Sequence, residues 1–297
     1  MNKLVRKKAG FSHIPVLLTE VLDGLNIQAG KQYIDATTGG GGHTQEIIQK
    51  GGRVLAIDQD DDALSHLQMK FAEEKNIKIV KGNFGEIEEI AHLHGFGKSA
   101  GVLFDLGMSS FQIDSSTRGF SFHKDQPLDM RMDEQQKLTA YDVVNRWTPD
   151  ALREVLLKYG EEHQATQVVD AIVSSRKIKK IETTAELVAI IKKVIRRNEK
   201  IHPATKVFQA IRIAVNAELE VLRKGLSGAL QVVDSDGRIV VISFHSLEDR
   251  IVKNTFREFE QKGYGQVFNK KPITATDSEI EVNPRSRSAK MRIFIKK

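Results

Sequence analysis

Four consecutive glycines, Gly39 to Gly42, separate a strand-like run from the start of a helix. The run before them spans residues 33–36, and a second strand-like run ends on an acid, Asp58. Glycine lets the backbone approach a ligand closely in a strand-to-helix turn, and a carboxylate at the tip of the next strand accepts hydrogen bonds from ribose hydroxyls. The pattern therefore predicts an α/β sheet that carries a nucleotide-type cofactor site.

The identity of the cofactor follows from the glycine spacing and from charge. The fingerprint G-x-G-x-x-G fails, because Thr44 or Gln45 stands where the third glycine belongs, and no Walker lysine follows. Three acids that end strand-like runs, Asp35, Asp58 and Asp105, are expected at one sheet edge. Such an edge repels a pyrophosphate and attracts a ligand carrying an ammonium and a sulfonium, which predicts S-adenosylmethionine. The alternative is that the glycines only form a turn and the aspartates only cap helices.

The composition narrows the class of protein. The chain has 297 residues, enough for one large domain or two modest ones. It has no membrane-length apolar run and no apolar stretch of a signal peptide near its start, so we expect a cytoplasmic protein. Zero cysteines exclude disulfides and thiolate metal sites, and the nine histidines show no metal-ligand spacing, so no metal is expected. The net charge of +6 favours a polyanionic partner.

Strands alternate with helices through the first third of the chain, which is typical of a parallel sheet. The expected strands lie at residues 31–36, 53–58, 77–80 and 100–106. Helical periodicity alone follows, at residues 149–159, 162–175 and 184–198, and then in one amphipathic helix after Pro203. A buried strand at 238–243, a helix at 247–259 and a terminal pairing of 266–268 with 291–295 complete the pattern. We predict a methyltransferase-type domain in two parts, 1–113 and 203–297, with a helical substrate-binding insert at 114–202.

Polar residues that follow the strands are candidates for chemistry. Asp105 and Ser109 stand in the loop after the fourth strand, followed by Gln112, and this loop should face the glycine loop across the cleft. Phe84, after the third strand, could flank an adenine or simply belong to the core. His245 follows the fifth-strand region at the same edge and could contact the acceptor, whereas Ser246 with Asp249 fits a capping box.

The insert opens with a segment that mixes aromatic, basic and acidic residues, 118–133, and this suggests a substrate loop. Phe120 or Phe122 could stack a base there or anchor the loop to the core. Residues 176–200 carry nine basic and three acidic side chains. A second basic cluster spans 285–290, and both clusters fit either phosphate binding or solvated surfaces.

Several long motifs, in order along essentially the whole chain, resemble one family: the bacterial small-subunit ribosomal RNA cytosine-N4 methyltransferases, called RsmH or MraW. The motifs are His13 to Leu18, Asp35 to His43, Asp105 to Ser110, Arg118 to Phe122, Pro127 to Met132, His202 to Thr205 and Ser243 to Arg250.

The resemblance implies a class I methyltransferase fold (α/β, Rossmann-like, with a mostly parallel sheet) carrying an all-helical insert. It also implies S-adenosylmethionine as methyl donor and, as substrate, the N4 amine of a cytosine in the decoding centre of 16S-type ribosomal RNA. The family's cofactor contacts would fall on Gly41, Gly42, His43, Asp58, Phe84, Asp105 and Gln112. Many amino-methylating enzymes carry Asp/Asn-Pro-Pro-aromatic after the fourth strand; this chain has Asp105-Leu106-Gly107-Met108, and so does the family.

The exocyclic amine of cytosine is a poor nucleophile, because its lone pair is delocalised into the ring. We expect Asp105, Ser109 or a backbone carbonyl of their loop to accept a hydrogen bond from it. The rival interpretations are an NAD-dependent oxidoreductase and a non-catalytic RNA-binding or assembly factor. The sequence leaves open whether naked RNA, a precursor particle or a 30S-type subunit is the partner, and whether the protein is a monomer or a homodimer.

Overall fold

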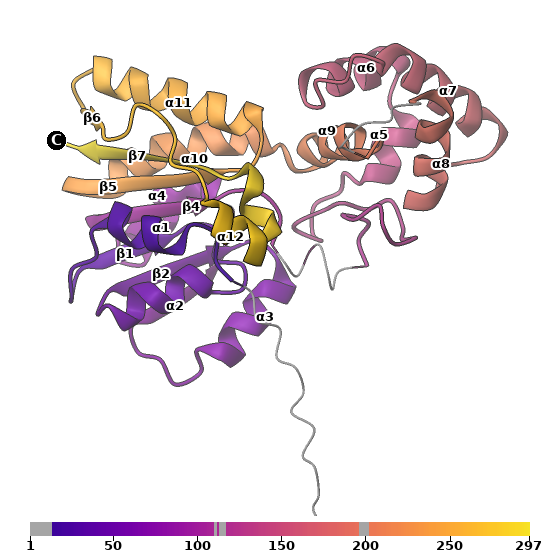
Figure 1. Cartoon of the computed structure of the whole chain (residues 1–297). Coiled ribbons are helices and arrows are strands. Elements are labelled where there is room, and N and C mark those ends of the chain that lie inside the picture. The colour runs from indigo at the N-terminus through magenta and orange to yellow at the C-terminus, as the bar shows by residue number, and fades with distance from the viewer. Residues whose placement is uncertain (1–13, 110–111, 113–116, 196–201) are drawn as a thin grey trace, which may run out of the picture.

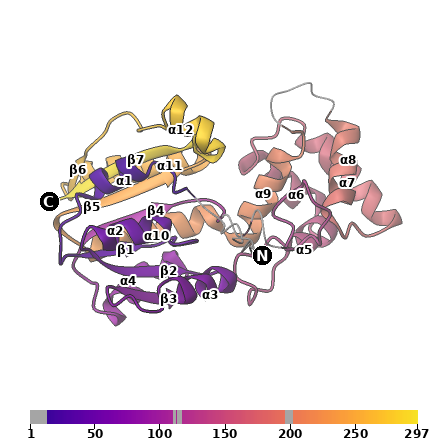
Figure 2. The same cartoon turned by 60° about the horizontal axis from the view of Figure 1, so that its bottom comes forward.

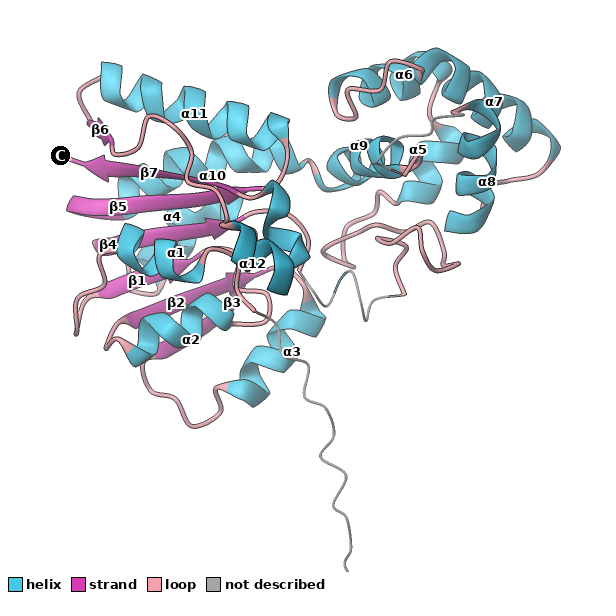
Figure 3. Ribbon diagram, viewed as in Figure 1, coloured by secondary structure: helices cyan, strands magenta, loops and turns pink. Residues whose placement is uncertain are grey.

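The structure is a computed structural model that describes residues 14–109, 112, 117–195 and 202–297. It has two bodies, one built on a β-sheet and one built of helices, which lie side by side in both views of Figures 1 and 2. All the strands gather in the first body, as the magenta arrows of Figure 3 show. The predicted division into an α/β part and a helical part is therefore visible in the arrangement of the elements.

The sheet has seven strands in the order β3-β2-β1-β4-β5-β7-β6. The first five in this order are mutually parallel, and β7 runs antiparallel between β5 and β6. The strands are β1 Gln32–Asp35, β2 Arg53–Asp58, β3 Ile77–Lys81, β4 Ser99–Asp105, β5 Val233–Ser243, β6 Gly265–Val267 and β7 Lys290–Lys296. The chain order reverses between β1 and β4, which is where open α/β sheets bind their ligands. The predicted parallel sheet is confirmed.

Helices cover both faces of this sheet, because its strands are apolar on both sides. On β5, Ile239 and Val241 pack into one core while Val240 and Ile242 pack into the other. The first core is covered by α4 Ile87–Leu93, α10 Glu218–Val232 and α11 Ser246–Gln261. The second is covered by α1 Leu18–Leu25 and α2 Gly42–Gln49, while α3 Asp61–Lys70 packs beside β2 and β3.

The predicted pairing of residues near 266–268 with 291–295 is confirmed in β6 and β7. The two strands are not joined by a tight turn, however. The connection contains α12 Asp277–Val282 and the short 3₁₀ helix η3 Pro284–Ser288, and another 3₁₀ helix, η1 Phe84–Glu86, follows β3. This connection carries the second basic cluster to the edge of the sheet body.

The helical body consists of five helices in the described residues, with its own apolar core. They are α5 Ala140–Arg146, α6 Pro149–Lys158, α7 Ala165–Ile178, α8 Thr184–Val194 and α9 Thr205–Asn216. The three predicted helices correspond to α6, α7 and α8. Helix α5 was not predicted, since it is short and its capping box, Thr139 with Asp142, uses aspartate instead of the usual glutamate.

The single amphipathic helix expected after Pro203 is two helices, because the chain breaks at Ala217 with left-handed dihedrals (φ 49°, ψ 32°). Before the break, α9 packs Val207, Phe208, Ile211 and Val215 into the helical body. After it, α10 packs into the core of the sheet body. The packing therefore favours a domain boundary at Ala217 rather than the expected one at residue 202.

Polar contacts bind the two bodies together next to this break. The guanidinium of Arg118, at the start of the insert, donates to both carboxylate oxygens of Asp60 at 2.9 and 2.8 Å. Both side chains are buried. Within the helical body, Asn216 at the end of α9 anchors the same segment, since it accepts a hydrogen bond from the backbone N–H of Met132 at 2.8 Å and donates to the Met130 carbonyl at 2.8 Å. The segment 118–133 is thus held against the sheet body rather than standing free.

Gly225 offers a test of how tightly α10 packs on the sheet body. A Cβ there would lie 2.7 Å from Cδ2 of Phe84 and 3.0 Å from the Phe84 carbonyl oxygen. Overpacking usually costs about 1–3 kcal/mol, which exceeds the helix-propensity gain of about 1 kcal/mol. We expect Gly225→Ala to lower the free energy of unfolding in urea, while Ser227→Ala, exposed on the same helix, leaves it nearly unchanged. Equal stability of both variants would show that α10 shifts freely.

Candidate functional site

A cavity of about 440 Å³ opens at the carboxyl ends of the parallel strands. Its walls come from the glycine loop after β1, the turns after β2, β3 and β4, the α9–α10 junction and the turn between β5 and α11. Among the predicted residues, those that line it are Gly42, His43, Asp58, Phe84, Asp105, Ser109, Gln112 and His245. The structure thus brings together side chains that lie more than 200 residues apart in the sequence.

The glycine loop needs glycine for two separate reasons. Gly39 and Gly41 have positive φ values of 50° and 70°, a region that disfavours side chains. At Gly42 a Cβ would lie 2.5 Å from Cγ of Pro15. Gly41 itself is buried and does not line the cavity, since its missing side chain would point at Leu67 in α3. Its assignment as a cofactor contact stays a prediction.

Asp58 holds the glycine loop as well as lining the cavity. One carboxylate oxygen accepts the backbone N–H of Gly39 at 2.7 Å, and the other accepts that of Asp60 at 3.0 Å. Burial raises the pKa of Asp58 to about 6, although these backbone hydrogen bonds oppose the rise. The acid therefore fixes the loop geometry, a role that the sequence analysis did not assign to it.

Asp105 is the least compensated acid of the cavity. Its Oδ1 is buried and has no hydrogen-bond partner among the described residues, and its Oδ2 lies 3.7 Å from Nδ1 of His43. Burial raises the pKa of Asp105 well above its usual range, and the charges of Asp35 and Glu248 raise it further. The pKa of Asp35 is also raised, to about 6, chiefly by burial. The predicted gathering of three acids at one sheet edge is confirmed.

This environment fits a cationic ligand. A buried carboxylate oxygen without a partner is costly, and an ammonium group would supply both the hydrogen bond and the opposite charge. His43 does not fill this role alone, because its Nε2 is engaged by the carbonyl oxygen of Val16 at 3.0 Å. The acids at this edge thus suit a ligand that carries an ammonium and a sulfonium, and their contacts with S-adenosylmethionine stay a prediction.

The loop after β4 faces the glycine loop across the cavity, as predicted. A Cβ on Gly39 would lie 3.4 Å from the Cβ of Ser109. Gln112 fixes this loop: its Oε1 accepts the backbone N–H of Ser109 at 3.0 Å and its Nε2 donates to Asp60 at 2.9 Å. Because Asp60 also binds Arg118, the same carboxylate ties the loop, the cofactor edge and the insert together.

Two aromatic predictions have definite outcomes. Phe84 lines the cavity and packs edge-on against Phe104, with ring centroids 5.6 Å apart, so it belongs to the edge of the core, and its contact with an adenine stays a prediction. Phe120 is buried in the helical core under Arg118, and is therefore an anchor. Phe122 stacks on His202 with a centroid distance of 4.6 Å, away from the cavity lining.

The basic clusters divide between structural and exposed side chains. Arg176 donates to the carbonyl oxygens of Val144 and Trp147 and so stabilises the helical body. Lys192 and Lys193 are exposed on α8. Other members of this cluster, Arg196, Arg197 and Lys200, lie outside the described residues. In the second cluster, Arg285 and Ser288 line the cavity.

Sequence analysis missed a polar wall of the cavity. Arg212 near the end of α9 and Glu218 at the start of α10 form a bidentate salt bridge across the break at Ala217. Both N···O distances are 2.8 Å. The expected capping box of Ser246 with Asp249 is wrong: His245 caps α11, and Glu248 closes the box. The sequence offered the His-x-x-Glu spacing as a signal, but nothing local marks the break at Ala217.

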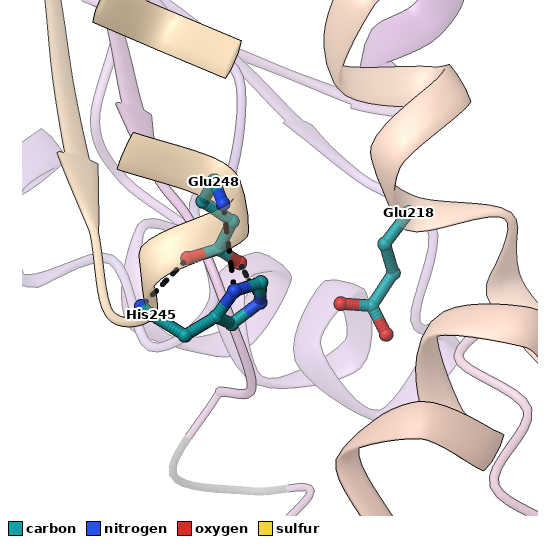
Figure 4. A group of neighbouring side chains, drawn as sticks. All are labelled: Glu218, His245 and Glu248. Atoms are coloured by element: carbon teal, nitrogen blue, oxygen red, sulfur yellow. Dashed lines mark hydrogen bonds and ion pairs between the residues drawn. The ribbon is translucent and has the colours of Figure 1, made fainter. Parts of the chain in front are cut away.

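One group of potential metal ligands comes together in the described part of the chain, formed by Glu218, His245 and Glu248 (Figure 4). Their ligand atoms lie within 4.8 Å of one another. Arg212 already neutralises Glu218, and Glu248 is engaged in capping α11. The expectation that no metal is needed stays a prediction.

Comparisons with known protein sequences agree on one family of methyltransferases. A family model described as the MraW methylase family matches residues 10–297. A protein of Carboxydothermus hydrogenoformans named ribosomal RNA small subunit methyltransferase H is 47% identical, over 95% of this chain and 97% of its own length. A protein of the same name from Persephonella marina is also 47% identical, over 95% and 98%.

Among solved structures, an rRNA methylase from Streptococcus thermophilus aligns with a TM-score of 0.46 at 9% identity, covering 96% of this chain and 99% of that one. This likeness is too weak to bear on function. No helix in the described ranges is both long and apolar enough to cross a membrane.

The raised pKa of Asp58 predicts a pH-dependent stability difference. Its pKa is about 6 in the folded chain against 3.8 ordinarily, so the folded state binds the proton more tightly. The ionised carboxylate therefore destabilises the folded state above a pH of about 6, the pKa of Asp58 in the folded chain. This destabilisation disappears as the pH falls toward the pKa of Asp58 in the unfolded chain. Asp58→Asn removes the charge but also replaces one of the two acceptor oxygens by an amide group, which adds a pH-independent cost. We therefore expect the stability of the wild type relative to this variant, measured by urea unfolding, to rise by about 1–3 kcal/mol as the pH falls from 7.5 to 4.5.

The exposed Asp61 in the next helix serves as the control, since Asp61→Asn should change stability little at either pH. A stability difference between Asp58→Asn and the wild type that stays the same from pH 7.5 to pH 4.5 would contradict this account of the acid-rich edge.

Proposed function

This chain belongs to the MraW methylase family, and from that membership we propose that it transfers a methyl group from S-adenosylmethionine to the N4 amine of a cytosine in small-subunit ribosomal RNA. The observation that carries the proposal is the buried Oδ1 of Asp105, which has no hydrogen-bond partner in the described part of the chain and belongs to a residue that lines the cavity beside the glycine loop. A cationic methyl donor offsets that charge, whereas a pyrophosphate cofactor would add to it.

Each cofactor-binding residue has a proposed role that its position supports. Asp105 and His43 would hold the amino-acid end, and the glycine loop with Gly42 would let the backbone approach it. Asp58 would accept the ribose hydroxyls, because it ends the strand next to β1. Phe84, already fixed by Phe104, would flank the adenine ring. When bound, the cofactor supplies an electrophilic methyl group on a sulfonium.

The chain's own residues then have to make the cytosine amine nucleophilic. We assign this role to the loop after β4, where Ser109 and Asp105 line the same cavity. A hydrogen bond accepted from the amine draws its lone pair out of conjugation, and holding the two reactants in line contributes much of the rate. The amine nitrogen would take the methyl group with the S–C electron pair remaining on sulfur, and the proton lost by the amine would pass to the carboxylate of Asp105, whose raised pKa suits a proton acceptor. The base must be unstacked to enter the cavity.

The partner would be small-subunit ribosomal RNA, at the decoding centre, either as RNA or within a 30S-type particle. The exposed lysines of α8 and the cavity-lining Arg285 support a polyanionic substrate that spans both bodies. We place the protein in the cytoplasm, where ribosomal subunits are made, as a monomer or homodimer.

Substitutions in the β4 loop test the chemistry. We expect Ser109→Ala to lower turnover by about 10-fold to 100-fold with unchanged cofactor affinity, because one acceptor contact to the amine is lost. Asp105→Asn should also weaken cofactor binding by about 10-fold or more, since a charged contact is removed. Methyl transfer to ribosomal RNA, calorimetry and mass spectrometry of the nucleosides provide the measurements, with Ser227→Ala as control. Methylation at carbon 5 or on ribose would refute this assignment, and full activity in both variants would move the chemistry elsewhere.

The basic arm can be tested separately. Replacing Lys192 and Lys193 by glutamine should weaken RNA binding and reduce its salt dependence by up to about 0.7–0.9 log units per lost phosphate contact. Cofactor affinity should not change. The matched control replaces Lys75 and Lys78, two exposed lysines before and within the edge strand β3. Equal effects of the two double substitutions would mean that α8 is only a solvated surface.

A further inference from the structure

The polar wall of the cavity, formed by His245, Glu248, Arg212 and Glu218, contains hydrogen-bonding groups that have no role in the proposed function so far. We propose that His245 and Glu248 read the Watson–Crick edge of the target base and select cytosine over uracil, with Arg212 and Glu218 as their positioning residues. This inference rests on the proposed function, since it concerns the substrate of the same site.

The wall lies on the acceptor side of the cavity. The candidate cofactor contacts come mainly from the turns after β1 and β2, whereas His245 and Glu248 follow β5, which pairs with β4. The backbone N–H of Leu106, in the β4 loop, donates to the carbonyl of Ile242 at 3.0 Å, which places the two loops side by side. A base that meets Asp105 and Ser109 therefore also meets this wall.

The hydrogen bonds of His245 assign its tautomer. Its Nδ1 accepts the backbone N–H of Glu248 at 3.4 Å as the cap of α11. In a neutral imidazole the proton then belongs to Nε2. This Nε2 is buried and lies 3.0 Å from Oε1 of Glu248. His245 thus directs its donor nitrogen at Glu248, and a base that enters the site would have to exchange this contact for its own.

Glu248 presents the acceptor beside that donor. Its Oε2 accepts the backbone N–H groups of Phe244 and His245 at 2.8 and 3.3 Å, which leaves Oε1 without a backbone donor. Burial raises the pKa of Glu248, but the interactions with His245, Phe244 and Arg212 outweigh it, and the pKa lies below its usual value. Oε1, which lies 3.0 Å from Nε2 of His245, is thus the oxygen left over for a base, although the side chain is only 2% exposed.

Arg212 and Glu218 surround this acceptor with a fixed pair of charges. The guanidinium of Arg212 is held by both oxygens of Glu218, and its charge acts on Glu248 as well. Glu218 faces the imidazole from α10, on the opposite side of the group (Figure 4). The break at Ala217 is what brings Glu218 round to this position, since it separates α9 from α10 between the two paired residues.

The pattern fits cytosine and opposes uracil. Cytosine carries an acceptor at ring nitrogen N3 next to the N4 amine donor, so Nε2–H can donate to N3 while Glu248 accepts one amine hydrogen. The second amine hydrogen remains for the loop of Asp105 and Ser109. Uracil presents the reverse pattern, with N3–H facing a donor and its O4 facing a carboxylate. A site built to pair with one pattern leaves buried polar groups unpaired with the other, which is a strong source of discrimination.

The test uses variants that preserve the helix cap. Glu248→Gln keeps an oxygen for the backbone N–H groups but replaces the free acceptor by a donor, and His245→Asn keeps a good capping residue while removing Nε2. Ser246→Ala, in the same turn and outside the cavity lining, is the matched control. The measurements are methyl transfer to unmethylated small-subunit particles, cofactor affinity, and binding of free cytidine and uridine in the presence of S-adenosylhomocysteine.

We expect both cap-preserving variants to lose about 10-fold to 100-fold in kcat/KM, with cofactor affinity unchanged, and to lose the preference for cytidine over uridine. Full retention of that preference in both variants would overturn the inference. A loss of activity that is fully explained by a smaller fraction of folded protein would overturn it as well. A requirement for a divalent cation, abolished by a chelator, would instead assign the three ligands to a metal. If the wild type itself transfers no methyl group to cytosine N4, the proposed function fails rather than this inference alone.

Discussion

The unpaired negative charge at the carboxyl edge of the sheet is the constraint on which the site depends. Asp35, Asp58 and Asp105 stand at the ends of neighbouring strands, and their pKa values are all raised, chiefly by burial. Two of these acids have hydrogen bonds to the glycine loop or to α2, whereas Oδ1 of Asp105 has none in the described structure. The fold thus tolerates a destabilising charge that a cationic cofactor would offset.

The second constraint is that the site belongs to both bodies. The β4 loop is fixed through Gln112 and Asp60 to Arg118 of the insert. The polar wall formed by Arg212, Glu218, His245 and Glu248 depends on the break at Ala217, where the chain passes from the helical core into the core of the sheet body. The residues that hold the two bodies together are therefore also residues that shape the cavity.

Much of this could be predicted from the sequence, because the relevant signals are local. Apolar runs that end on aspartate gave the parallel strands and the acid-rich edge, and helical periodicity gave α6, α7 and α8. The boundary at Ala217 could not be predicted, because its apolar face continues from α9 to α10 while the two halves pack into different cores. The pairing of Arg212 with Glu218, and hence the polar wall, depends on that break and is equally invisible.

Proton release on cofactor binding tests the central claim most directly. If S-adenosylmethionine binds at an edge whose acids are partly protonated near pH 6, its positive charge must drive them to ionise. Calorimetric titrations in two buffers of different ionisation enthalpy give the number of protons exchanged. The account predicts net release of protons near pH 6, and less release in Asp58→Asn. Binding without proton exchange, or with proton uptake, would contradict it.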